Sequence, residues 1–149
     1  MPKRALLMPL CAAVLAAIVL AGPSSRCAAA VAPEYWTALS RTAMAITGDV
    51  RFTPAQIVFQ NRRAMKIAPV PRPRGFPAAA TVLYRVMPPS DPVLLNGNRL
   101  CGARRVTYVL VSRTRSPAGD VELSVYTGAR PPANEGDGLC ATYFYQRVR

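Results

Sequence analysis

Apolar and polar residues alternate along several short stretches of the chain, which is the spacing of β-strands that bury one face. Residues 44–52 alternate in this way, and residues 56–60 resume the pattern after a break at Thr53-Pro54, which predicts a hairpin. Residues 65–70 are a shorter candidate. Later runs rich in β-branched or aromatic residues predict strands at 80–87, 105–113, 121–126 and 139–148.

Two short segments have the composition of tight turns. Residues 61–63 form a predicted turn after the first hairpin. Asn96-Gly97 is a dipeptide that tolerates positive φ, so we expect a hairpin between residues 93–95 and Leu100.

Two longer segments read as loops. Residues 69–78 contain four prolines, and proline cannot donate a backbone hydrogen bond to a sheet, so we expect a rigid, extended loop there. Residues 128–138 contain paired prolines and several glycines and form the second long loop.

One helical signal precedes the strands. Pro33 and Glu34 suit the first turn of a helix, and Trp36, Leu39 and Ala43 follow at helical spacing, which predicts a short helix over residues 33–43. Six to eight short strands follow. The sequence therefore predicts a mainly β fold, a small antiparallel β-sandwich or barrel with a short N-terminal helix.

The start of the chain has the layout of a secretory signal peptide. Two cations precede an uncharged apolar run at 5–21, and small residues follow it. We expect residues 1–30 to be the signal peptide, with cleavage after Ala30, and residues 31–149 to be one exported domain in the periplasm or outside the cell. The alternative is an uncleaved N-terminal helix that anchors the protein to the inner membrane. No transmembrane span is expected after cleavage.

Removal of this leader would leave two of the four cysteines, Cys101 and Cys140. An even number of cysteines in an exported chain indicates a disulfide. Closing a loop of about 40 residues restricts the unfolded chain by roughly 4 kcal/mol in the entropy model. Because no Cys-x-x-Cys motif is present, a structural bridge is favoured over a redox-active pair.

The mature chain is strongly basic. The leader holds three of the 19 basic residues, so 16 remain against seven acidic ones, a formal net charge of +9. Guanidinium groups pair well with phosphate and carboxylate. Clustering predicts these candidate anion-binding residues: Arg62, Arg63, Lys66, Arg72, Arg74, Arg104 and Arg105. The alternative is a solvated arginine surface that reflects GC-rich codon usage. Nucleic acid is not an expected partner, because chromosomal DNA is absent from the periplasm.

The sequence offers little catalytic chemistry. It contains no histidine, which excludes imidazole metal sites and Ser-His or Cys-His nucleophile pairs. The carboxylates form no convincing catalytic pair, and Glu135 and Asp137 supply too few oxygen ligands for a calcium loop. We therefore expect no enzymatic activity, no cofactor and no metal. Tyr143 and Tyr145 share one strand face, which we expect to be core, with an exposed recognition surface as the alternative.

The layout of leader, small β-domain and single bridge resembles that of small exported bacterial proteins, among them periplasmic lysozyme inhibitors, although no inhibitor loop motif is present. We expect a non-enzymatic binding or structural protein that meets an unknown protein through the loops 61–78 and 128–138, because long loops on a rigid scaffold often carry function. One alternative is a basic protein that binds anionic lipid or polysaccharide of the envelope through its arginine clusters. Another is an inhibitor of a secreted or periplasmic enzyme.

Overall fold

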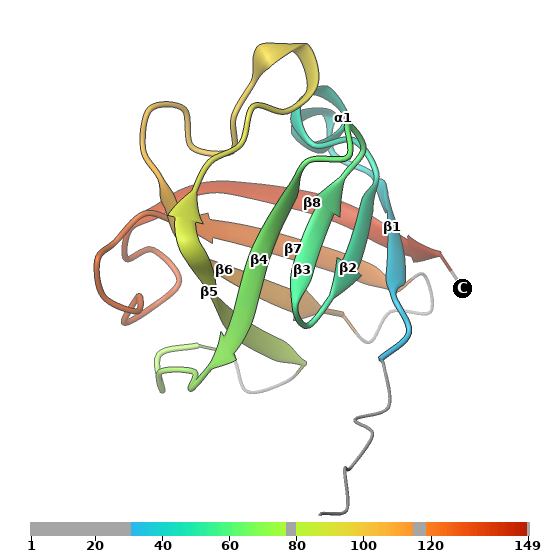
Figure 1. The fold of residues 1–149 in the computed structure, drawn as a ribbon. Coiled ribbons are helices and arrows are strands. Elements are labelled where there is room, and N and C mark those ends of the chain that lie inside the picture. The colour runs from blue at the N-terminus through green and yellow to red at the C-terminus, as the bar shows by residue number, and fades with distance from the viewer. Residues whose placement is uncertain (1–30, 77–79, 115–118, 149) are drawn as a thin grey trace, which may run out of the picture.

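The computed structural model describes residues 31–76, 80–114 and 119–148. Eight antiparallel strands follow one another around a closed barrel, and the last strand pairs with the first (Figure 1). The strands are β1 (Glu34–Ala38), β2 (Val50–Thr53), β3 (Gln56–Phe59), β4 (Ala64–Val70), β5 (Thr81–Ser90), β6 (Val106–Arg113), β7 (Asp120–Tyr126) and β8 (Leu139–Val148). The mainly β fold is confirmed, as a barrel. The predicted leader lies outside the described residues.

The N-terminal helix is shorter and later than predicted. Residues 34–38 form β1, in which Trp36 and Ala38 are buried and Tyr35 is exposed. Helix α1 (Arg41–Ile46) begins after Ser40, whose Oγ accepts a hydrogen bond from the backbone N–H of Ala43 at 3.1 Å. The predictions of a helix over 33–43 and a strand over 44–52 were therefore wrong at this junction. Pairing of β1 with both β2 and β8 outweighs the local helical spacing.

Aromatic rings fill one end of the barrel interior. Trp36 stacks on Phe52 with ring centroids 4.6 Å apart, and Tyr84 meets Phe52 edge-on at 5.6 Å. The guanidinium of Arg113 lies 5.3 Å from the Phe52 ring centroid and donates to the Glu34 carboxylate at 2.9 Å. This ion pair joins β6 to β1, two strands that are not neighbours in the sheet.

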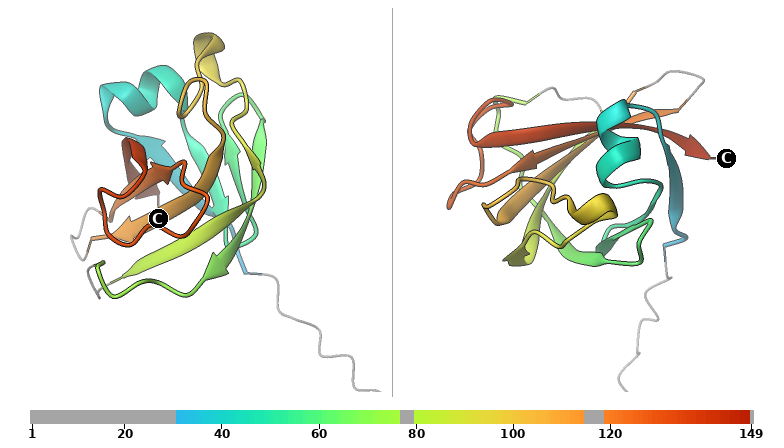
Figure 2. Two further views of the ribbon diagram at one scale, coloured as in Figure 1. Left: turned by 90° about the vertical axis from the view of Figure 1, so that its left-hand side faces the viewer. Right: turned by 90° about the horizontal axis from the view of Figure 1, so that it is seen from above.

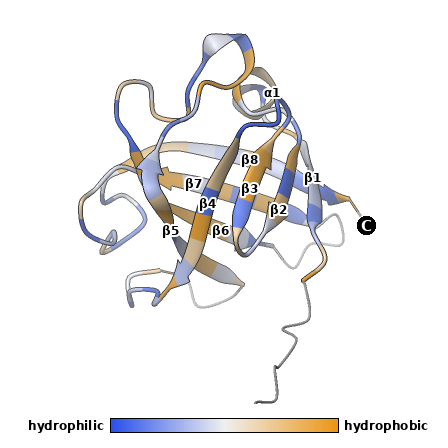
Figure 3. Cartoon of the chain, in the orientation of Figure 1, coloured by the Kyte–Doolittle hydropathy of each residue, from blue (hydrophilic) through white to orange (hydrophobic). Residues whose placement is uncertain are grey.

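Two buried tyrosines complete the interior near the other end. Tyr143 donates from its hydroxyl to the carbonyl of Leu100 at 3.0 Å, and the hydroxyls of Tyr145 and Thr47 are 2.8 Å apart. Phe144, between the two tyrosines, points outward and is exposed. The assignment of Tyr143 and Tyr145 to the core is confirmed. Apolar and polar residues alternate along β2, β3 and β4 (Figure 3), as expected for strands with one face inward.

Helix α1 and the connection 91–105 lie over one end of the barrel (Figure 2). Within the connection, residues Leu95–Gly97 form a 3-10 turn, and the predicted hairpin is wrong. Asn96 and Gly97 do adopt positive φ, at 54° and 75°. One backbone hydrogen bond crosses the turn, from the N–H of Leu94 to the carbonyl of Asn98 at 2.7 Å, but no strands flank it, and Leu94 and Leu100 pack into the core.

A second apolar cluster lies on the outer face of three strands, β5, β6 and β7. Alternate residues of these strands, such as Tyr84 and Val109, belong to the interior cluster, so the two clusters occupy opposite faces of the sheet. Strand β4 contributes through Val70. Pro69 and Val70 both pair with β5, so the following loop begins two residues later than predicted. The outer cluster consists of Val70, Phe76, Leu83, Tyr108, Leu110 and Tyr126.

Candidate functional site

Two loops that are far apart in the sequence meet over the outer cluster. Phe76 is only 5% exposed and packs edge-on against Tyr126, with ring centroids 6.5 Å apart. This contact holds residues 71–76 beside residues 128–138, and both segments lie on the same side of the barrel (Figure 2). We call these two segments together the paired-loop surface. Both come from the loops predicted to bind a partner, whereas the turn at 61–63 lies apart from them, between β3 and β4.

Backbone contact between the two loops is close. Gly75 forms an isolated parallel bridge with Asn134. A Cβ atom added to Gly75 would lie 2.4 Å from the carbonyl oxygen of Ala133, which is nearer than real Cβ contacts come. Only glycine therefore fits at this position without a shift of the backbone.

Hydrogen bonds inside the second loop keep it in one shape. The Asn134 side chain accepts from the backbone N–H groups of Gly136 and Asp137, at 3.0 and 3.1 Å. The Asp137 carboxylate accepts from the N–H of Ala133 at 2.9 Å. Tyr126 donates from its hydroxyl to the carbonyl of Glu135 at 3.1 Å, which ties the loop to β7. The loop is thus ordered although it contains no strand or helix.

The second loop lines an open pocket of about 520 Å³. One cationic and one anionic side chain contribute to it, and most of the remaining lining is backbone and small side chains. The lining residues are Gly128, Ala129, Arg130, Pro131, Ala133 and Asp137.

The connection 91–105 is held by a buried carboxylate. Asp91 accepts hydrogen bonds from the backbone N–H groups of Leu100 and Cys101, at 2.8 and 2.7 Å. Arg99 donates to the backbone carbonyl of Asp91. Burial raises the pKa of the Asp91 carboxyl above its usual value, and the two N–H donors oppose that shift. The carboxylate acts as an internal anchor.

A disulfide joins the same connection to the sheet. Cys101 is bonded to Cys140 in β8, and their Cα atoms are 5.7 Å apart. The pairing and the position of each cysteine, one ahead of β6 and one within β8, agree with the sequence analysis. The bridge and the Asp91 anchor act on adjacent residues, so they fix one point of the connection together.

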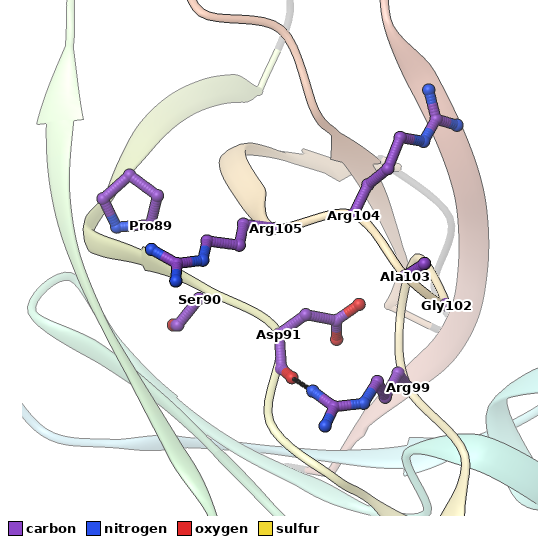
Figure 4. A pocket seen from close by; sticks show the side chains of 8 residues that line it. All are labelled: Pro89, Ser90, Asp91, Arg99, Gly102, Ala103, Arg104 and Arg105. Carbon is purple, nitrogen blue, oxygen red and sulfur yellow. Dashed lines mark hydrogen bonds between the residues drawn. The ribbon is translucent and has the colours of Figure 1, made fainter.

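A pocket of about 500 Å³ opens beside this anchor (Figure 4). The side chains of Arg99 and Arg105 lie on either side of Asp91, and Arg104 extends away from Arg105. The pocket is lined by Pro89, Ser90, Asp91, Arg99, Gly102, Ala103, Arg104 and Arg105. The sequence analysis had selected Arg104 and Arg105 but missed Arg99, because its place depends on a backbone carbonyl eight residues earlier.

The predicted anion-binding residues do not gather in one place. Arg62 and Arg63 occupy the turn between β3 and β4, and Lys66 lies within β4. Arg72 and Arg74 precede Gly75 on the paired-loop surface, and Arg104 and Arg105 belong to the pocket beside Asp91. Their role in anion binding remains a prediction.

The described residues contain no group of three or more cysteine or acidic side chains placed to hold a metal ion. Among the helices formed by these residues, none is long and apolar enough to cross a membrane. No family model matches the chain, and the searches of curated proteins and of solved structures likewise found no match.

Proposed function

We propose that the protein is an exported, non-enzymatic binding protein that meets its partner through the paired-loop surface. The observation that carries this proposal is the direct contact between the two loops at Gly75 and Asn134. Loops usually lose conformational entropy when they bind, and that loss weakens the complex. Here the order exists before binding, since prolines, internal hydrogen bonds and the buried Phe76 already restrict both segments.

The charge of the surface limits the kind of partner. Arg72 and Arg74 precede Gly75 on one loop, and Arg130 lines the pocket of the other. The Asp137 carboxylate on the same loop is engaged by a backbone N–H. A partner protein with an acidic surface patch would complement this arrangement.

The proposal is tested by a single substitution that separates the loops. Gly75→Ala places a methyl group against the backbone of Ala133, so the two segments must move apart. Recovery of bound protein from an envelope extract should fall by about tenfold, because the preformed surface is lost. The immobilised protein is compared with the variant at equal loading, with quantitative mass spectrometry of the eluate as the measurement.

Gly136→Ala is the matched control in the same region. Its added methyl group would meet its nearest neighbour at 3.6 Å, an ordinary contact distance. This variant should recover the same proteins as the wild type. Equal recovery by wild type and Gly75→Ala, with the loops shown by exchange to have separated, would refute the proposal.

A second candidate function is binding of anionic lipid or polysaccharide by the whole basic surface. The net charge of +9 expected for the mature chain supports it. Binding to vesicles that contain phosphatidylglycerol should then weaken steeply with salt. Gly75→Ala should leave such binding unchanged, which separates the two candidates. Absence of vesicle binding at low salt would remove this second candidate.

A further inference from the structure

The pocket beside Asp91 is preformed and lies on a different part of the chain from the paired-loop surface. Its walls come from the end of β5 and from residues 99–105. The disulfide at Cys101 and the two hydrogen bonds to the Asp91 carboxylate fix this segment. A ligand would therefore find the pocket already in shape.

The pocket has an excess of positive charge. Three arginines line it against a single carboxylate, that of Asp91, which is 7% exposed. Both oxygens of this carboxylate already accept backbone N–H groups, so it does not neutralise the arginines by direct pairing. Arg104 and Arg105 form no ion pair or hydrogen bond with any residue in the described ranges. An excess of two positive charges suits a dianion better than a monoanion.

The shape of the pocket indicates what carries the anion. A volume of about 500 Å³ is far larger than a phosphate group, so a further part of the ligand would enter with it. The lining contains a serine hydroxyl, exposed backbone at Gly102 and Ala103, and no aromatic ring. Without a ring to stack on, a nucleobase has little to gain here. A small hydroxylated molecule that bears the anionic group fits this lining better.

We propose that this pocket binds a phosphomonoester of a sugar or similar polyol. Arg105, whose guanidinium lies beside Ser90 in Figure 4, binds the phosphate, and Ser90 meets a hydroxyl or phosphate oxygen. The same chemistry occurs in free sugar phosphates and in phosphorylated sugars of envelope polysaccharides.

The direct test is titration of the purified protein with glucose 6-phosphate by calorimetry. Arg105→Ala should weaken binding by at least about tenfold, because charge-assisted hydrogen bonds to phosphate are lost. Arg51→Ala removes the same charge from an exposed position of β2 that does not line the pocket, and it should change the affinity by less than about threefold. Glucose itself should not bind measurably.

Three results would overturn the proposal. One is no binding of glucose 6-phosphate at millimolar concentration. Another is an equal loss of affinity in Arg51→Ala and Arg105→Ala, which would mean attraction to surface charge alone. The third is tighter binding of adenosine monophosphate than of glucose 6-phosphate. Competition by a phosphorylated polysaccharide, measured in a parallel arm, distinguishes a polymer-borne ligand from a free sugar phosphate. Gly75→Ala should bind glucose 6-phosphate as the wild type does, so this site and the paired-loop surface can fail separately.

Discussion

The connection 91–105 and the paired-loop surface are both ordered without regular strands, but by different means. The first is held by a covalent bond at Cys101 and by a carboxylate that binds backbone N–H groups. The second is held by a glycine that allows backbone contact and by the burial of Phe76. The order of the first region therefore depends on the oxidised disulfide and on the charge of Asp91. The order of the second depends on close backbone contact and apolar packing.

This difference suits the two proposed roles. A pocket for a small anion requires guanidinium groups at fixed positions, which a disulfide and a buried carboxylate provide. A surface for a partner protein requires a larger area whose order comes from many weak contacts. Perturbations should therefore act on one region and spare the other, and the predictions below follow in order of decreasing effect.

Removal of the disulfide should have the largest effect. In Cys101→Ser with Cys140→Ser, the free energy of unfolding should fall by about 4 kcal/mol, because the unfolded chain regains the freedom of a loop of 39 residues. Urea denaturation measures this difference. Amide exchange should rise in 91–105 and stay low in 128–138, and a rise of equal size in both segments would contradict the comparison.

Truncation of Phe76 should affect the opposite region. Phe76→Ala removes the ring that covers the outer cluster and should cost about 3 kcal/mol in thermal or urea unfolding. Phe144→Ala is the matched control, because that ring is 47% exposed and should cost less than about 1 kcal/mol. Similar losses in the two variants would show that Phe76 does not hold the loops.

Loss of the Asp91 carboxylate should have a smaller effect, confined to the connection. Asp91→Ala leaves the N–H groups of Leu100 and Cys101 without their acceptor and should cost about 2 kcal/mol. Asp91→Asn keeps one acceptor oxygen and should lose about half as much. Chemical denaturation gives both values, and an Asp91→Ala variant as stable as the wild type would exclude the anchor.

Alkaline titration compares the regions through two strand tyrosines: Tyr126 donates to the paired-loop surface at Glu135, and Tyr143 donates to the connection at Leu100. Burial raises the pKa of Tyr126 and of Tyr143 to about 12, above the usual value of 10.0. Below pH 10 these phenols are protonated in both states. Between pH 10 and 12 the unfolded chain loses these protons and the folded chain keeps them, so stability should fall as the pH rises. Tyr126→Phe and Tyr143→Phe should each reduce this fall, as measured by urea unfolding at several pH values. An unchanged pH dependence in both would contradict the raised pKa values.

The strands and connections differ in how far the sequence predicts them. Local sequence identified β5 to β8 closely, because each is a run rich in β-branched or aromatic residues. It failed at β1, where Trp36 and Ala43 also lie at helical spacing and only pairing with β8 decides between helix and strand. Asn96 has the expected positive φ, but the hairpin does not form, since Asp91 binds the residues that would have made its second strand.

For the candidate sites, too, local sequence predicted the segments but not the contacts between them. Both loops were predicted as binding segments from their prolines and glycines. Their contact at Gly75 and Asn134 was not predicted, because it joins residues far apart in the chain and depends on the barrel between them. Arg99 was missed for a related reason, since its position follows from the fold of the connection.

Hydrogen–deuterium exchange of the protein bound to its captured partner tests the central claim most directly. The account predicts slower exchange in both 71–76 and 128–138 on binding, with residues 91–105 unchanged. Protection of only one of the two loops, or protection confined to another face of the barrel, would contradict the claim that the paired loops act as one binding surface.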